Sequence, residues 1–239
     1  MMTIKNTIIA AALVAAASAY AAAPKYTFLF IGDGMSVPQR MTANEFSIKT
    51  GNGPLEMNEL PISGLARSCS ADSLITDSAA AATAIACGRK TNNHYSGVDP
   101  EGNPLESCAV AAQKAGRKVG IMTTVTITHA TPAGFYAHRE SRGDTFGIST
   151  DLADSGFDFF AGGGLGGPED DSPTNRYLYA QSKGYQLITN RADFAALKPG
   201  CGKILTKFTN DALETAIDWE ESLGQPKLDE IVAKAIEVL

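Results

Sequence analysis

The sequence lacks two features that mark common functional classes: a cluster of basic residues and a large set of histidines. Its 26 Asp and Glu outnumber its 20 Lys and Arg, and the net charge is −6 at pH 7. Nucleic-acid binding depends on clustered Lys and Arg, so no nucleic-acid partner is expected. Only three histidines occur, His94, His129 and His138, and none forms an HxxxH pair. A two-zinc site needs several His and Asp ligands, which this chain does not supply by itself.

The cysteines form no CxxC pair, which argues against a zinc site built from thiolates. They are Cys69, Cys87, Cys108 and Cys201. After the first residues of the chain, no apolar run is long enough to cross a membrane. Hydrophobic residues still make up 44% of the sequence, which is enough to bury a globular core.

Residues 1–23 have the pattern of an export signal. Lys5 precedes a short apolar stretch, residues 8–17, and small residues allow cleavage at positions between 19 and 23. The alternative, a membrane anchor, is disfavoured because the stretch is too short to span ~30 Å of hydrocarbon. We therefore expect a periplasmic or secreted protein with no membrane span after cleavage. In that oxidising setting we expect one or two disulfides, and spacing does not choose among the possible pairings.

Apolar segments that suit buried strands alternate with segments that suit helices. The expected strands are residues 26–31, 118–125, 156–164 and 184–189. The expected helices are residues 78–87, 105–115 and 132–138. This alternation predicts an α/β fold with a largely parallel central sheet flanked by helices, extending over residues 24–239.

A further helix is expected after Pro226, where apolar side chains recur on one face as far as Leu239. The sequence stops on that apolar face, without a capping glycine or a polar ending. We therefore expect the fold to be incomplete at the C-terminus, with residues 24–239 forming the N-terminal part of a larger domain.

The segment TDSAAAATAIACG places Ser78 at the start of an alanine-rich helix that Gly88 ends. Unpaired N–H groups and the helix dipole favour an anion beside such a hydroxyl. The alanines keep bulk away from whatever binds the serine. The alternative is an ordinary helix cap made by Asp77 or Ser78, and the segment taken alone favours this cap.

Asp33 lies between two glycines, directly after the strand expected over residues 26–31. Ligand sites of parallel sheets lie at the carboxyl ends of the strands, so Asp33 is a candidate metal ligand or catalytic group. The alternative is an Asp-Gly turn with no chemical role.

Another polar group follows the strand expected over residues 118–125. His129, Thr131 and Arg142 are placed near the same predicted sheet edge. The planar guanidinium of Arg142 suits bidentate binding of a phosphate. Each of these residues also has an ordinary alternative, as a packed histidine or a surface cation.

Taken together, three segments resemble the alkaline phosphatases. They are FLFIGDGM, TDSAAAATAIACG and THATPAGFYAHRESR, in the order and spacing of that family. The resemblance implies that Ser78 is the nucleophile that becomes a phosphoserine. It also implies that Arg142 holds the substrate phosphate and that Asp77 positions Arg142.

The resemblance further implies two Zn²⁺ ions and one Mg²⁺ ion. Asp33 would bridge a zinc and the magnesium, and His129 and Thr131 would lie at the magnesium site. Ser78 would meet a zinc. The familiar bacterial form has aspartate where this chain has His129, so the metal preference of that site stays open. The family's zinc histidines and most of its other metal ligands come from sequence beyond residue 239.

The implied function is that of an exported, metal-dependent hydrolase of phosphate monoesters, with a homodimer as a family expectation. Because most metal ligands are missing, the 239-residue chain alone is expected to be inactive. The alternative is a catalytically inactive fragment or a non-enzymatic phosphate-binding module. The sequence GGGLGG (residues 162–167) matches a dinucleotide-binding motif, but Pro168 follows where a helix should begin, so no nucleotide cofactor is expected.

Overall fold

The computed structural model describes residues 24–167 and 175–239. The expected export signal, residues 1–23, and part of the acidic loop, residues 168–174, lie outside the described residues. The chain forms two compact units, Met1–Glu59 and Leu60–Leu239. No helix in the described ranges is long and apolar enough to cross a membrane.

The described part of the first unit is helical. Helix α2 (Val37–Lys49) is followed by a short 3-10 helix, η1 (Glu56–Asn58). The side-chain oxygen of Asn44 links the two, because it accepts hydrogen bonds from the Leu55 N–H (3.0 Å) and the Asn58 amide (2.7 Å).

The strand expected over residues 26–31 does not form, so that prediction was wrong. A strand is held by hydrogen bonds to a neighbouring strand, and residues 24–59 contain no second strand to provide them. The apolar side chains of this segment are exposed, Phe30 most of all at 76%. An apolar run alone therefore did not identify a strand.

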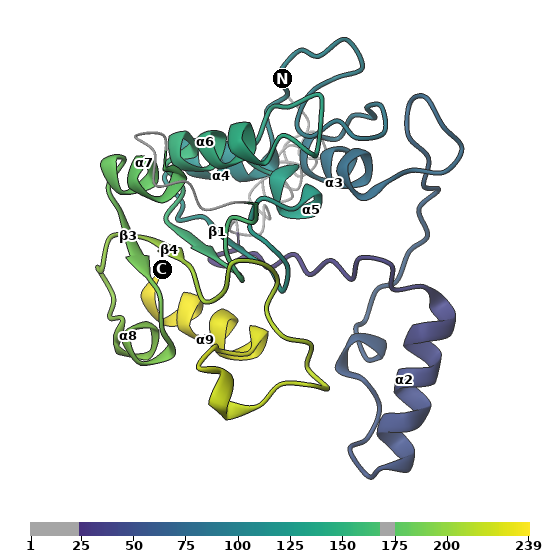
Figure 1. Cartoon of the computed structure of the whole chain (residues 1–239). Coiled ribbons are helices and arrows are strands. Elements are labelled where there is room, and N and C mark those ends of the chain that lie inside the picture. The colour runs from purple at the N-terminus through teal and green to yellow at the C-terminus, as the bar shows by residue number, and fades with distance from the viewer. Residues whose placement is uncertain (1–23, 168–174) are drawn as a thin grey trace, which may run out of the picture. The chain divides into compact units, whose positions relative to one another are not determined.

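The second unit is built around a four-stranded sheet (Figure 1). Its strands are β1 (Gly120–Met122), β2 (Phe159–Ala161), β3 (Tyr185–Ile188) and β4 (Lys203–Thr206), in the order β1-β2-β4-β3. All three pairings are parallel. The expected α/β fold with a parallel sheet is confirmed, and β4 is a strand that the sequence analysis did not predict.

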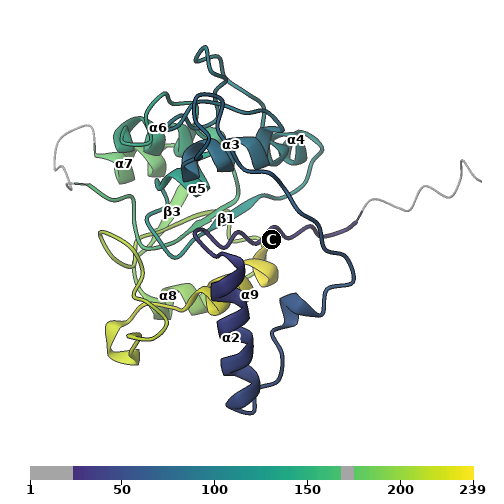
Figure 2. The same cartoon turned by 90° about the vertical axis from the view of Figure 1, so that its right-hand side faces the viewer.

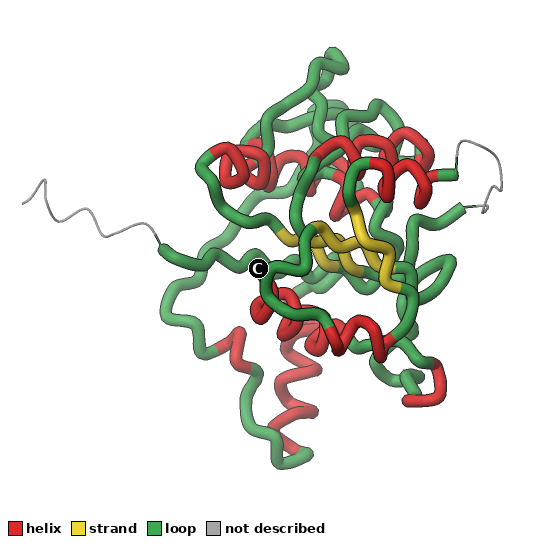
Figure 3. The backbone as a smooth tube through the Cα atoms, turned by 90° about the vertical axis from the view of Figure 1, so that its left-hand side faces the viewer, coloured by secondary structure: helices red, strands yellow, loops and turns green. Residues whose placement is uncertain are grey.

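Helices cover both faces of this sheet (Figure 2). One layer contains α3 (Ser78–Cys87), α4 (Cys108–Lys114), α5 (Ala130–Ala133), α6 (Thr145–Ser155) and α7 (Arg176–Ser182). The other contains α8 (Arg191–Ala196) and α9 (Leu228–Val238), with the 3-10 helix η2 (Glu221–Leu223) before α9. The sheet between the two layers is shown in yellow in Figure 3.

Alternate strand residues face two separate apolar cores. Phe160 of β2 packs in the core under α3–α7, whereas its neighbours Phe159 and Ala161 pack in the core under α8 and α9. Leu205 and Ile204 of β4 divide between the two cores in the same way. Burial on both faces is the reason that these strands are continuous apolar runs in the sequence.

Predicted helices form at residues 78–87 and after Pro226, as α3 and α9. The helix expected over residues 132–138 instead begins at Ala130 and ends at Ala133. The chain then turns against α3 at Gly134, where a Cβ would lie only 2.8 Å from the Cβ of Ala82. This packing, which no local pattern reveals, sets the length of α5. The sequence analysis did not predict α6, α7 or α8.

All four cysteines are free thiols, so the expected disulfides are not formed in this structure. Cys87 ends α3, Cys108 begins α4, and the other two lie in loops. Burial raises the pKa of the Cys87 thiol to about 11, with a smaller contribution from Cys108. Cys87 is therefore a packed, unreactive thiol at neutral pH.

The glycine run after β2 is explained by a chain segment that crosses it. A Cβ on Gly163 would lie 1.8 Å from the backbone oxygen of Asp211, and one on Gly164 would lie 2.3 Å from that of Thr209. The Gly163 carbonyl also accepts hydrogen bonds from the N–H groups of Phe208 (2.8 Å) and Thr209 (3.0 Å). The glycines therefore serve backbone packing, and no helix begins among residues 162–167.

We expect Gly163→Ala to destabilise the second unit by about 1–3 kcal/mol, because the added methyl group overlaps a backbone atom that cannot move freely. Urea unfolding measures the change. Gly64→Ala is the matched control, since a Cβ at Gly64 meets nothing within 4 Å. Equal stability of the two variants would contradict the packing role assigned to Gly163.

Candidate functional site

Helix α3 begins at Ser78 and is capped by Asp77, not by the serine. The Asp77 side chain accepts a hydrogen bond from the Ala80 N–H (2.9 Å). Gly88 ends the helix in the left-handed conformation, with φ of 68°. The cap considered from the sequence is therefore real, and it leaves Ser78 as the first residue of the helix.

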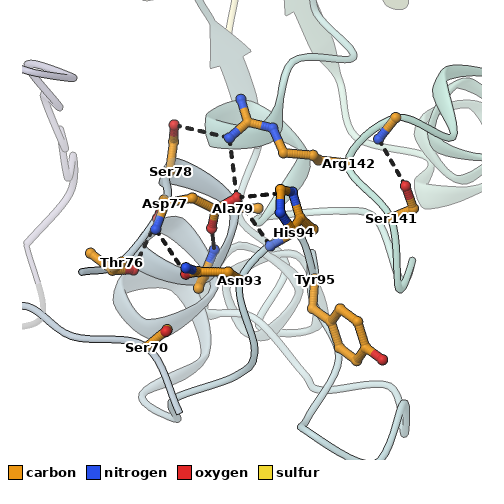
Figure 4. Close-up of polar contacts among 12 residues, drawn as sticks. Ser70, Thr76, Asp77, Ser78, Ala79, Asn93, His94, Tyr95, Ser141 and Arg142 are labelled. Carbon is orange, nitrogen blue, oxygen red and sulfur yellow. Dashed lines mark hydrogen bonds and ion pairs between the residues drawn. The ribbon is translucent and has the colours of Figure 1, made fainter. Parts of the chain in front are cut away.

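Asp77 is the residue that joins the parts of the candidate site (Figure 4). Its Oδ2 accepts hydrogen bonds from the His94 backbone N–H (3.0 Å) and from Nη1 of Arg142 (3.2 Å). Its own backbone N–H donates to Oδ1 of Asn93 (2.9 Å). Together with the bond from Ala80, the Asp77 carboxylate thus links the first turn of α3 to the loop at His94 and to the side chain of Arg142.

These hydrogen bonds also set the charge of Asp77. Burial raises its pKa, but the hydrogen bonds from Ala80, His94 and Arg142 outweigh that effect and hold the pKa below the usual range of an aspartate. Asp77 is therefore an anion at neutral pH. Because its folded-state pKa is lowered, its contribution to stability is present above the unfolded pKa and is lost as pH falls through the folded value.

Arg142 lies across the start of α3. Its Nη1 is shared between Asp77 and the hydroxyl oxygen of Ser78, which it approaches to 3.5 Å. Its backbone N–H donates to the His94 carbonyl (2.7 Å), which fixes this part of the chain. The side chain is 29% exposed. A guanidinium has five N–H donors, so Arg142 has donors to offer a bound anion while it contacts Asp77.

Two site residues, Asn93 and His94, were not predicted from the sequence. Asn93 accepts from Asp77 and donates through its amide to the Ile75 carbonyl (3.0 Å), while Asp72 accepts from its backbone N–H (2.9 Å). The only sequence signal was the polar run TNNH, which is typical of a turn. Its position beside α3 depends on tertiary packing.

The other predicted site residues lie in two different places. His129 stands at the N-cap position of α5, without a capping hydrogen bond from its side chain, and Thr131 lies within α5, the short helix that packs against α3. Asp33 belongs to the first unit, where it is exposed in a turn closed by the Met35 N–H and the Gly32 carbonyl (3.2 Å). The Asp-Gly turn considered from the sequence is thus present. His138 is a loop residue whose Nδ1 lies 2.8 Å from the Gly97 carbonyl oxygen.

The donor types at the predicted metal positions suit the expected ions only in part. Carboxylate and hydroxyl oxygens suit Mg²⁺, and an imidazole suits Zn²⁺. Within residues 24–167 and 175–239, however, no three His, Cys, Asp or Glu side chains gather into a group that could hold a metal. The described residues therefore do not build a metal site by themselves.

Asp77, Ser78 and Arg142, which we call the anion site, gather groups that can attract an anion. The first N–H groups of α3 and the helix dipole favour negative charge beside Ser78. Arg142 adds a full positive charge on the same side, and Asp77 orients it. The Ser78 hydroxyl lies between these two sources of positive potential.

Comparisons with known proteins find relatives within one family. The profile of the family described as alkaline phosphatase matches residues 25–155. An alkaline phosphatase of Schizosaccharomyces pombe is 34% identical over 90% of this chain and 43% of its own length. The chain thus spans less than half the length of this curated relative.

Solved structures show the same likeness. A cold-active alkaline phosphatase from a psychrophilic Shewanella sp. superposes with a TM-score of 0.76 and 30% identity, over 87% of this chain and 51% of that one. A mutant alkaline phosphatase of the Antarctic bacterium TAB5, with a histidine replaced by aspartate and magnesium bound in its M3 site, has a TM-score of 0.63 and 29% identity, over 72% and 51%. From its motifs, its parallel sheet and these matches, the chain belongs to the alkaline phosphatase family.

Proposed function

We propose that the whole protein is an exported, metal-dependent phosphate monoester hydrolase that acts through a phosphoserine at Ser78. The observation that carries the proposal is the position of the Ser78 hydroxyl, at the N-terminus of α3 and 3.5 Å from Nη1 of Arg142. Family membership supports phosphomonoester hydrolysis as the reaction. Export rests on the signal pattern of residues 1–23.

The reaction assigns each member of the anion site a task. The Ser78 oxygen attacks phosphorus in line while its hydroxyl proton passes to solvent, and its bond to phosphorus forms as the bond to the alcohol oxygen breaks. The departing alcohol takes up a proton from solvent. Water later cleaves the phosphoserine, which restores the Ser78 hydroxyl and releases phosphate. Arg142 donates hydrogen bonds to the phosphoryl oxygens, where charge develops in the transition state. Asp77 holds Arg142 in place, and the N–H groups of α3 add fixed positive potential.

We also propose that Zn²⁺ and Mg²⁺ complete this site in the whole protein. The residues of this chain that would contribute ligands are Asp33, Ser78, His129 and Thr131. When bound, such ions supply positive charge and lower the pKa of bound hydroxyl groups. The TAB5 structure with bound magnesium supports a magnesium site in the family, and a homodimer remains the family-based proposal for assembly.

A non-enzymatic phosphate-binding module is the second candidate. It is favoured by one observation: the described residues gather no metal-binding group. Such a module would bind phosphate through Arg142 and α3 but would not depend on Ser78 for turnover. The two candidates therefore differ in what a serine substitution does.

We expect Ser78→Ala in the whole protein to lower turnover of an aryl phosphate by several orders of magnitude, because it removes the atom that forms the covalent intermediate. Turnover and far-UV circular dichroism are measured together. Ser73→Ala, a change to a nearby serine that lies outside α3, is the control. Near-normal turnover by Ser78→Ala would show that Ser78 is not the nucleophile.

We expect Arg142→Ala to weaken inhibition by inorganic phosphate about tenfold or more, since a hydrogen bond to a charged group contributes roughly 1.5–3 kcal/mol. Arg142→Lys keeps the charge but loses the planar fork, so its inhibition constant should lie between those of the parent and Arg142→Ala. Inhibition constants that match the parent in both variants would exclude a contact between Arg142 and phosphate.

We expect His129→Asp to tighten Mg²⁺ binding, because Mg²⁺ prefers oxygen ligands to imidazole nitrogen. Equilibrium dialysis of the whole protein against magnesium measures the dissociation constant independently of activity. His138→Asp is the control, since it changes a histidine outside the proposed metal site. The same magnesium affinity in His129→Asp and in the parent would remove His129 from that site.

A further inference from the structure

His94 has an unusual backbone conformation. Its φ is +73°, and no other non-glycine residue in the described ranges has a positive φ. The Tyr95 N–H donates to the Asn92 carbonyl (3.2 Å), so these residues close a β-turn with His94 in third place. Because Asn93 in second place does not share the positive φ, the turn is of type II, which prefers glycine or asparagine where His94 stands.

Both backbone groups of His94 hold the anion site together. Its N–H donates to Oδ2 of Asp77 (3.0 Å), and its carbonyl accepts from the N–H of Arg142 (2.7 Å). Glycine would make the same two bonds without the strain of a side chain at positive φ. The backbone contacts therefore explain the turn but not the histidine.

The imidazole of His94 lies beside the same carboxylate oxygen. Its Nδ1 is 3.8 Å from Oδ2 of Asp77, which also accepts the hydrogen bond from Arg142 (3.2 Å). The charged groups around the ring are Asp77, Arg142 and, through a weaker electrostatic interaction, Asp72. The ring is 71% exposed, so it lies on the open side of the anion site.

We propose that His94 is a positioning residue of the anion site, whose imidazole shares the Asp77 carboxylate with Arg142 and so leaves the guanidinium available to the bound phosphate. Asp77 anchors Arg142 through Nη1, and in the described ranges the ring is a second side chain beside the same oxygen. By moderating that hold it leaves the other guanidinium N–H groups free to bind the phosphate. The inference rests on the proposed function, since it concerns the phosphate bound at Ser78 by Arg142.

Two substitutions separate the ring from the turn. His94→Gly removes the imidazole and relieves the positive φ, so the thermal unfolding midpoint should stay the same or rise. His94→Ala removes the imidazole but keeps the unfavourable φ, so its midpoint should lie below that of His94→Gly. We expect both to weaken inhibition of the whole protein by inorganic phosphate about two- to fivefold, the size of a weak contact at an exposed site.

The two variants are thus expected to differ in thermal stability but to lose phosphate binding to the same extent. If His94 acted only through its backbone conformation, phosphate binding would instead follow stability. Tyr95→Phe, in the same turn, is the matched control and should leave inhibition unchanged. Parent-like inhibition of His94→Gly would overturn the inference and reduce His94 to a turn residue. Arg142→Ala is measured in parallel. If Arg142→Ala also leaves inhibition by phosphate unchanged, the proposed anion site itself is wrong. If only Arg142→Ala weakens inhibition, the result refutes the role of His94 and leaves the anion site in place.

Discussion

The candidate site depends on one carboxylate, that of Asp77. It caps α3 through Ala80, binds the backbone of His94 and orients the guanidinium of Arg142. These bonds keep it ionised by holding its pKa low despite partial burial. The charge that stabilises the helix start therefore also places the arginine beside Ser78, so that helix capping and the position of Arg142 are two results of the same contacts.

The surrounding fold supplies rigidity to that carboxylate. Helix α3 packs tightly on the α5 turn because alanines and Gly134 leave no room for larger side chains. Behind this layer, β2 is buried on both faces and Gly163 is crossed by the backbone of residues 208–211. The anion site is thus built on a helix and two loops that are held by backbone and small-residue packing.

Local sequence patterns predicted the elements that are determined by neighbouring residues. Helix α3 has the predicted limits, because Asp77 and Gly88 terminate it with standard capping chemistry. The parallel sheet followed from apolar runs that are buried on both faces. Residues 26–31 were wrongly predicted as a strand, since strand formation requires a hydrogen-bonding partner that composition does not reveal.

The sequence by itself determined the helix that presents Ser78, the α/β class and the types of residue suited to a phosphate. Only the tertiary structure decided which residues meet there. Arg142 reaches Ser78 from 64 positions away, and His94 reaches Asp77 from 17 positions away. Such contacts depend on how loops pack against α3, where a left-handed turn at His94 brings its backbone N–H and carbonyl to two different partners. The physical reason is that helix caps and apolar periodicity act over a few residues, whereas the anion site is formed by hydrogen bonds between distant segments.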